Sequence, residues 1–145
     1  MKTINCKGKL IDLLTPKVMG IINLTPDSFY DGGKFCSEKE VICQAQKMLE
    51  EGATFLDLGG YSSRPGAKFV SEEDELNRVL PVVKILIKEF PNVNLSIDTF
   101  RSKIAKTCLE NGACMINDIS AGLLDPQMLG VIANYKVPIV MMHMR

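Results

Sequence analysis

The chain has 145 residues, with 17 Lys plus Arg and 17 Asp plus Glu, so its formal net charge is zero. Hydrophobic residues make up 46% and charged residues 23%, which excludes a disordered or low-complexity chain. A neutral chain lacks the basic stripe of a nucleic-acid-binding protein, and no apolar run approaches the ~20 residues that span a bilayer. We therefore expect a globular protein that binds neither nucleic acid nor membrane.

The five cysteines show no C-x-x-C spacing, and the amino terminus has no apolar stretch of signal-peptide length. The spacing fits no zinc template, and the chain has only one His to help. We interpret the cysteines as reduced thiols and expect a cytoplasmic protein.

Short apolar runs alternate with helical patterns along the chain. Ser71 and Asp74 form a capping-box pattern that predicts the start of the second helix. Pro81 inside that helical pattern predicts a kink or a break. Asp125 and Pro126 predict the start of the fourth helix, as N-cap and first helical residue. The five predicted strands cover residues 18–24, 54–60, 93–98, 114–119 and 137–143.

Strict alternation of strands and helices predicts a parallel sheet covered by helices. The nearly continuous apolar character of the strands agrees, because parallel strands are buried on both faces. Residues 52–57 and 112–117 also form a weak repeat, in which a helix-ending Gly precedes an apolar strand and a polar residue. Repeated units of this kind favour an α/β fold of the (β/α) barrel type, with a doubly wound sheet as the alternative.

Polar residues lie near the carboxyl ends of the predicted strands. In a parallel α/β fold these ends point to one side, where the active site lies. Together they offer donors and acceptors for a polar heterocycle, although each one alone is also compatible with a strand cap. His143 is open to two interpretations, as a general base or as a structural residue. The five are Asn23, Asp57, Asp98, Asn117 and His143.

The loops after the first two strands are the most specific features. Residues 62–66 (SSRPG) combine hydroxyls with one Arg, the side chain suited to bidentate recognition of a phosphate. Residues 23–29 (NLTPDSF) form a polar and aromatic loop directly after a strand. Neither is a Walker-type or dinucleotide-binding glycine loop.

At these residues the chain resembles the dihydropteroate synthases. Residues 19–29 (MGIINLTPDSF) resemble the first signature of that family, and residues 56–60 with 62–67 resemble the second. Residues 96–99, 116–119 and 142–144 match the later strand ends in the same order. The resemblance implies a (β/α)8 TIM barrel, of which this chain supplies about five strands and four helices. Residues 1–145 would then be the N-terminal part of a single pterin-binding domain.

The resemblance also implies a reaction of folate biosynthesis. The family joins 6-hydroxymethyl-7,8-dihydropterin diphosphate to p-aminobenzoate and releases 7,8-dihydropteroate and diphosphate. Asp98 and Asn117 correspond to residues that bind the pterin, and Asp98 would stabilise the cation left by loss of diphosphate. Asn23 corresponds to the ligand of a Mg²⁺ cofactor that also holds the diphosphate.

The remaining assignments fall on the second loop and its neighbours. Ser63 and Arg64 belong to the loop that covers the diphosphate and p-aminobenzoate, with Ser63 also at the pterin. Phe29 and Pro65 would flank the p-aminobenzoate ring, in the pocket where sulfonamides compete. Asp57 would organise this loop from below. The resemblance thus predicts Asp98, Arg64 and Asp57 as the catalytic residues.

The chain departs from the family pattern in two ways. Tyr61 stands where many members have Glu, and Ser63 where many have Thr. Members also continue beyond the fifth strand into an Asp that binds pterin, a Ser-Arg-Lys strand end and a final Arg-x-His. We therefore expect this chain alone to be inactive, and the full-length protein to be a homodimer.

Two alternatives stay open at this point. One is a pterin-binding protein related to the methyltetrahydrofolate–corrinoid methyltransferases, against which the SSRPG loop argues because no diphosphate need be held there. The other is a non-catalytic truncated product. The reading frame downstream of Arg145 distinguishes truncation from a longer protein.

Overall fold

A computed structural model describes residues 2–24, 38–61 and 69–143. Two strands, β1 (Thr3–Cys6) and β2 (Lys9–Asp12), form an antiparallel hairpin at the start. Strands and helices then alternate as predicted. The series is β3 (Val18–Asn23), α1 (Glu38–Glu50), β4 (Ala53–Gly59), α2 (Glu72–Glu89), β5 (Leu95–Asp98), α3 (Ser102–Glu110), β6 (Met115–Asp118), α4 (Met128–Tyr135) and β7 (Ile139–Met141).

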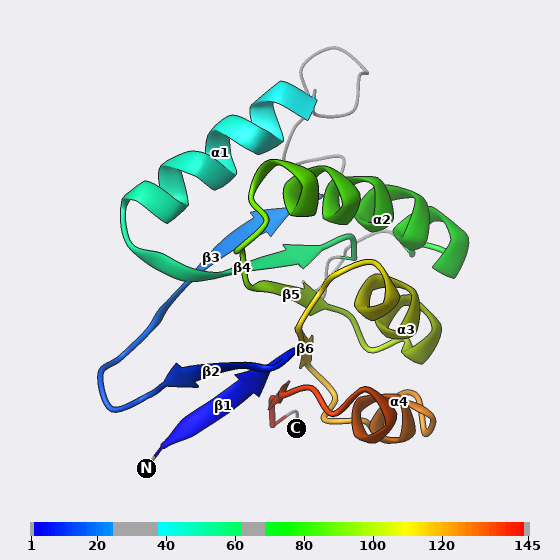
Figure 1. The fold of residues 1–145 in the computed structure, drawn as a ribbon. Helices are drawn as coiled ribbons and strands as arrows, with labels where there is room; N and C mark the ends of the chain where they lie inside the picture. Colours follow the sequence, from blue (N-terminus) through cyan, green and yellow to red (C-terminus); the bar gives the residue numbers. More distant parts are fainter. Residues whose placement is uncertain (1, 25–37, 62–68, 144–145) are drawn as a thin grey trace.

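The five later strands form one parallel sheet in the order β3-β4-β5-β6-β7. A doubly wound sheet reverses its strand order at a switch point, whereas this order follows the chain. The helices lie along one face of the curved sheet (Figure 1). This is the arrangement of a (β/α) barrel, and β3 and β7 are the two edges of the part described.

Side chains alternate between the two faces of each strand. Those that point toward the helices are apolar and have no exposed surface. They pack with the buried faces of α1 to α4 into one continuous core, so the opposite face is left for polar residues. The strand residues of this core are Ile22, Leu56, Leu58, Leu95, Ile97 and Ile116.

The β1–β2 hairpin was not predicted from the sequence. Its two-residue turn places Lys7 and Gly8 at positive φ, 52° and 86°, as a tight hairpin turn requires. Cys6 and Ile11 pack against Phe55 and other residues near the starts of β4 and β6. The hairpin therefore covers the amino ends of the strands, opposite the polar strand ends.

Two of the predicted helix features need correction, and one is confirmed. Ser71 caps α2, because its Oγ accepts a hydrogen bond from the Asp74 backbone N–H at 3.0 Å. Of the two alternatives at Pro81, a kink or a break, the break is wrong, since α2 runs from Glu72 to Glu89. Pro81 is exposed, so the backbone carbonyl that loses its partner at this site can be hydrated.

The predicted start of the fourth helix is also wrong. The helix begins at Met128, after an N-cap at Gln127. Asp125 instead accepts a hydrogen bond from the backbone N–H of Ser102, the first residue of α3, at 2.7 Å. Its other carboxylate oxygen accepts from the Gln127 N–H at 2.9 Å. Asp125 thus joins the start of α3 to the turn before α4.

Among the described residues, no helix is both long enough and apolar enough to cross a membrane. The four cysteines within the described ranges are free thiols, as predicted. They are Cys6, Cys43, Cys108 and Cys114.

Candidate active site

The register of the parallel strands places polar residues side by side on the face away from the helices. Asn23 lies opposite Gly59, Gly59 opposite Asp98, and Asp98 opposite Asn117. These four positions form an upper layer at the carboxyl ends of β3 to β6. The structure therefore brings together three of the five predicted strand-end residues, Asn23, Asp98 and Asn117.

Asp57 lies one layer deeper in the sheet, two residues before β4 ends at Gly59. Its register neighbours are Ile21 on β3 and Ser96 on β5, and Ser96 in turn lies opposite Met115 on β6. We call these four residues the lower layer. The resemblance places Asp57 below the second loop, whereas its hydrogen-bond partner among the described residues is Asn117.

His143 does not join this arrangement. The register position beside Asn117 is taken by Val140, and β7 ends at Met141. His143 follows the strand and is exposed. The structure thus favours a role for His143 outside the two layers, and the general-base interpretation finds no support in its position.

The lower layer and the Asn117 side chain next to it contain buried polar atoms without partners. Asn117 Nδ2 donates to Asp57 Oδ2 at 2.9 Å, and Asp57 is 4% exposed and Ser96 0% exposed. Within the described residues, Asp57 Oδ1, Ser96 Oγ and Asn117 Oδ1 have no hydrogen-bond partner. Such atoms cost free energy in a folded protein. A cluster of three such atoms indicates a candidate functional site. The sequence analysis missed Ser96, although it lies two residues before Asp98 and so on the same face of β5.

Burial and neighbouring negative charges raise the proton affinity of Asp98. Burial, followed by the negative charges of Asp57, Glu75 and Asp118, raises the pKa of Asp98 to about 7. Burial also raises the pKa of Asp57, and the nearby Ser96 hydroxyl and Asn117 amide oppose that shift. Asp98 is therefore poised between its neutral and ionised forms near neutral pH. Perturbed carboxyl groups in a concave site are typical of catalytic machinery.

Gly59 makes room for the Asp98 side chain. A Cβ atom added at Gly59 would lie 3.2 Å from Asp98 Oδ2, closer than ordinary van der Waals contact. The glycine lets the carboxyl group lie against β4 in the upper layer. This role of Gly59 could not be predicted from its own segment, because it depends on a residue on another strand.

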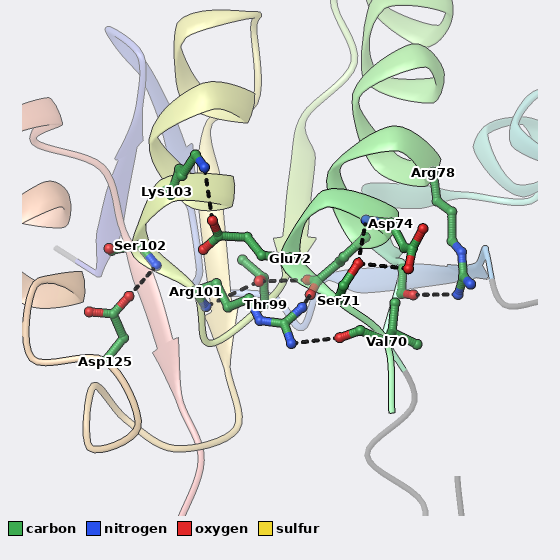
Figure 2. Close-up of polar contacts among 12 residues, drawn as sticks. Val70, Ser71, Glu72, Asp74, Arg78, Thr99, Arg101, Ser102, Lys103 and Asp125 are labelled. Atoms are coloured by element: carbon green, nitrogen blue, oxygen red, sulfur yellow. Dashed lines mark hydrogen bonds and ion pairs between the residues drawn. The ribbon is translucent and has the colours of Figure 1, made fainter. Parts of the chain in front are cut away.

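A buried ion pair supports the site from the helix side. Glu75, in the first turn of α2, is 0% exposed. It accepts a hydrogen bond from Thr99 Oγ1 at 2.7 Å and forms an ion pair with Arg101. Arg101 Nη2 also donates to the Val70 carbonyl at 2.7 Å, as Figure 2 shows. The sequence analysis missed this network because its charges come from separate elements.

Arg101 also lies over three aromatic rings. Its guanidinium carbon is 5.4 Å from the ring centre of Tyr61, 5.9 Å from that of Phe69 and 5.0 Å from that of Phe100. Close by, Arg78 Nη1 donates to the Gly60 carbonyl at 3.2 Å. The chain on both sides of residues 62–68 is thus held against α2 and the start of α3.

Four predicted site residues lie outside the described residues, so their assigned roles stay predictions. They are Phe29, Ser63, Arg64 and Pro65.

Asn23 fits the donor chemistry expected for Mg²⁺. It ends β3 in the upper layer and is exposed. Mg²⁺ prefers oxygen ligands and is often held by one or two protein groups together with phosphate oxygens and water. Within the described ranges, no group of three or more His, Cys, Asp or Glu is placed to hold a metal ion.

Comparisons with known proteins agree with this geometry. The sequence model of the pterin binding enzyme family matches residues 19–145. A dihydropteroate synthase of Staphylococcus haemolyticus is 50% identical over 127 residues, which are 88% of this chain and 47% of that protein. The dihydropteroate synthase of Xanthomonas albilineans, solved with 4-aminobenzoic acid, is 42% identical with a TM-score of 0.89, covering 98% of this chain and 51% of that one.

A further solved structure is the Yersinia pestis dihydropteroate synthase in complex with a sulfonamide drug. It is 43% identical with a TM-score of 0.88, and the match covers 99% of this chain and 52% of that one. This chain therefore spans about half the length of the relatives it matches. The likeness also identifies the five-stranded sheet as part of a TIM barrel.

Proposed function

Because this chain belongs to the pterin binding enzyme family, we propose that the protein containing it is a dihydropteroate synthase. It joins 6-hydroxymethyl-7,8-dihydropterin diphosphate to p-aminobenzoate. The observation that carries this proposal is the upper layer, in which Asp98 and Asn117 lie in register above a buried polar floor. The solved relatives described above support it, because they hold 4-aminobenzoic acid and a sulfonamide drug.

The residues of the upper layer suit the chemistry of this reaction. The bond between the methylene carbon of the pterin and the diphosphate oxygen breaks, and the amine nitrogen of p-aminobenzoate then bonds to that carbon and loses a proton. Loss of diphosphate leaves positive charge on the pterin. The ionised carboxyl group of Asp98 stabilises that charge, and Asn117 beside it hydrogen-bonds the edge of the ring.

The diphosphate end of the substrate belongs to the first two loops. Asn23 would hold Mg²⁺, which when bound neutralises the diphosphate and eases its departure. Arg64 and Ser63 would bind the same group, and Phe29 and Pro65 would flank the p-aminobenzoate ring. The proposal further includes a cytoplasmic location, which rests on the cysteine pattern, and a homodimer for the complete protein, which rests on the family resemblance.

The test is diphosphate release by the complete natural protein that contains this chain. Release that requires both the pterin diphosphate and p-aminobenzoate supports the proposal, and a sulfonamide should inhibit it competitively with p-aminobenzoate. Absence of release, together with a melting temperature that does not respond to Mg²⁺ and diphosphate, would favour the methyltransferase alternative. The same protein in light scattering tests the dimer.

A further inference from the structure

We propose that Asp57 is a positioning residue of this site, which holds the Asn117 amide in one orientation beside Asp98. The inference rests on the proposed function, because it explains how the pterin-binding side chain is kept in place. It also changes the role of Asp57. The family resemblance implies that Asp57 organises the second loop from below. The structure instead assigns it to the lower layer, where it accepts a hydrogen bond from Asn117.

Asp57 is more deeply buried than Asn117. The residue is 4% exposed, and its Oδ1 atom is among the fully buried atoms of the lower layer. Its other carboxylate oxygen, Oδ2, accepts the hydrogen bond from Asn117 Nδ2 at 2.9 Å. Asn117 belongs to the upper layer and is partly exposed. The hydrogen bond to Asn117 therefore links Asp57 to the upper layer.

An acid at this position fixes the direction of the amide. An ionised carboxylate only accepts hydrogen bonds, whereas a carboxamide has one end that donates and one that accepts. Asn117 must then turn its NH₂ group toward Asp57. An Asn at position 57 would allow both orientations of the Asn117 amide. The site would then lose the fixed arrangement of hydrogen-bond donor and acceptor that recognises the edge of the pterin ring.

The negative charge of Asp57 leads to a second prediction, which concerns the pKa of Asp98. The carboxyl groups that act on Asp98 come from three elements, with Asp57 on β4, Glu75 on α2 and Asp118 on β6. Glu75 is itself paired with Arg101. Replacing Asp57 by Asn removes one of these negative charges with almost no change of shape. The pKa of Asp98 should then fall.

The experiment is a double-mutant cycle in the complete protein, with Asp57→Asn, Asn117→Ala and the double variant. Calorimetry with 6-hydroxymethylpterin measures ring binding. We expect each single variant to weaken binding by roughly 10- to 100-fold, and the double variant to be no weaker than Asn117→Ala, because the two residues act as one unit. The KM for p-aminobenzoate should stay within about 2-fold of the wild-type value.

The pH profile of kcat/KM for the pterin substrate is the second measurement. Its acidic limb should move to lower pH in Asp57→Asn, and it should not move in the control Asp12→Asn, which changes an exposed carboxylate on β2. Additive losses in the cycle, or an acidic limb that stays in place, would overturn the inference.

A third variant covers the case that Asp57→Asn does not fold. Ser96→Ala removes the hydroxyl group that opposes the raised pKa of Asp57 and so favours its ionised form. Without it the protonated acid can also donate to the Asn117 amide, and ring binding should weaken by roughly 2- to 5-fold. Unchanged ring binding would then refute the inference. If the wild-type protein shows no p-aminobenzoate-dependent diphosphate release, the proposed function is contradicted. The double-mutant cycle measures binding rather than activity, so it tests the role of Asp57 separately.

Discussion

Asp98→Asn should stabilise the protein while it abolishes most of the activity, and the gain in stability should depend on pH. Folding raises the pKa of this carboxyl group from 3.8 to about 7. As the pH rises above about 4, the unfolded chain loses this proton while the folded protein keeps it, so the folded state becomes less stable. The loss is complete above about pH 7.

The size of the effect follows from the shift. Three pKa units at 1.36 kcal/mol each give about 4 kcal/mol for an isolated group. Asp98 is partly exposed and shares its charge interactions with other carboxyl groups, so screening reduces the expected effect to about 1–3 kcal/mol. Asp98→Asn stays neutral at every pH and should be more stable than wild type by that amount at pH 8, with almost no difference at pH 4.

Urea unfolding of the complete protein between pH 4 and pH 8 measures this difference. The control Asp12→Asn changes an exposed carboxylate on β2 and should stay within about 0.5 kcal/mol of wild type throughout. Equal stability of Asp98→Asn and wild type at pH 8, or a difference that does not change with pH, would show that Asp98 is not held in a site that penalises its charge.

Three further predictions concern the surroundings of the site. Arg101→Met leaves the fully buried Glu75 without its ion-pair partner and should lower the free energy of unfolding in urea by about 3–5 kcal/mol. The control Lys103→Ala breaks the exposed pair with Glu72 and should lower it by less than about 1 kcal/mol. Gly59→Ala places a Cβ 3.2 Å from Asp98 Oδ2 and should lower kcat/KM by about 10-fold or more through a strain of about 1–3 kcal/mol. The control Gly130→Ala has open space around its Cβ and should leave kcat/KM unchanged. This 145-residue chain expressed alone should self-associate through the edges β3 and β7 and release no diphosphate, so a monodisperse monomer in light scattering would refute the edge argument.

Much of the fold could be predicted because its signals are local. The apolar runs and the caps around them mark β3 to β7 and the four helices, and their strict alternation predicts a parallel sheet. The hairpin β1–β2 escaped because it is short and half polar, and its burial depends on Phe55 and Met115 from later strands. Asp125 was misassigned for a related reason, since its carboxylate bonds to Ser102, which is distant in sequence.

The upper layer of the site was predictable because Asn23, Asp98 and Asn117 lie where parallel strands end. The lower layer was not, because the neighbours of Asp57 depend on which residues of the adjacent strands lie opposite it in the sheet. The same limit applies to Glu75 and Arg101. Their pairing joins α2 to the start of α3, and no periodicity in either segment predicts it.

The most direct test of the proposed reaction is mass-spectrometric detection of its product. The complete protein, the Asp98→Asn variant and the Asp12→Asn control would each be incubated with 6-hydroxymethyl-7,8-dihydropterin diphosphate, Mg²⁺ and p-aminobenzoate. We predict 7,8-dihydropteroate from the wild type and the control at similar rates, and a rate at least about 100-fold lower from Asp98→Asn. No dihydropteroate from the wild type, or equal rates from the wild type and Asp98→Asn, would contradict the account.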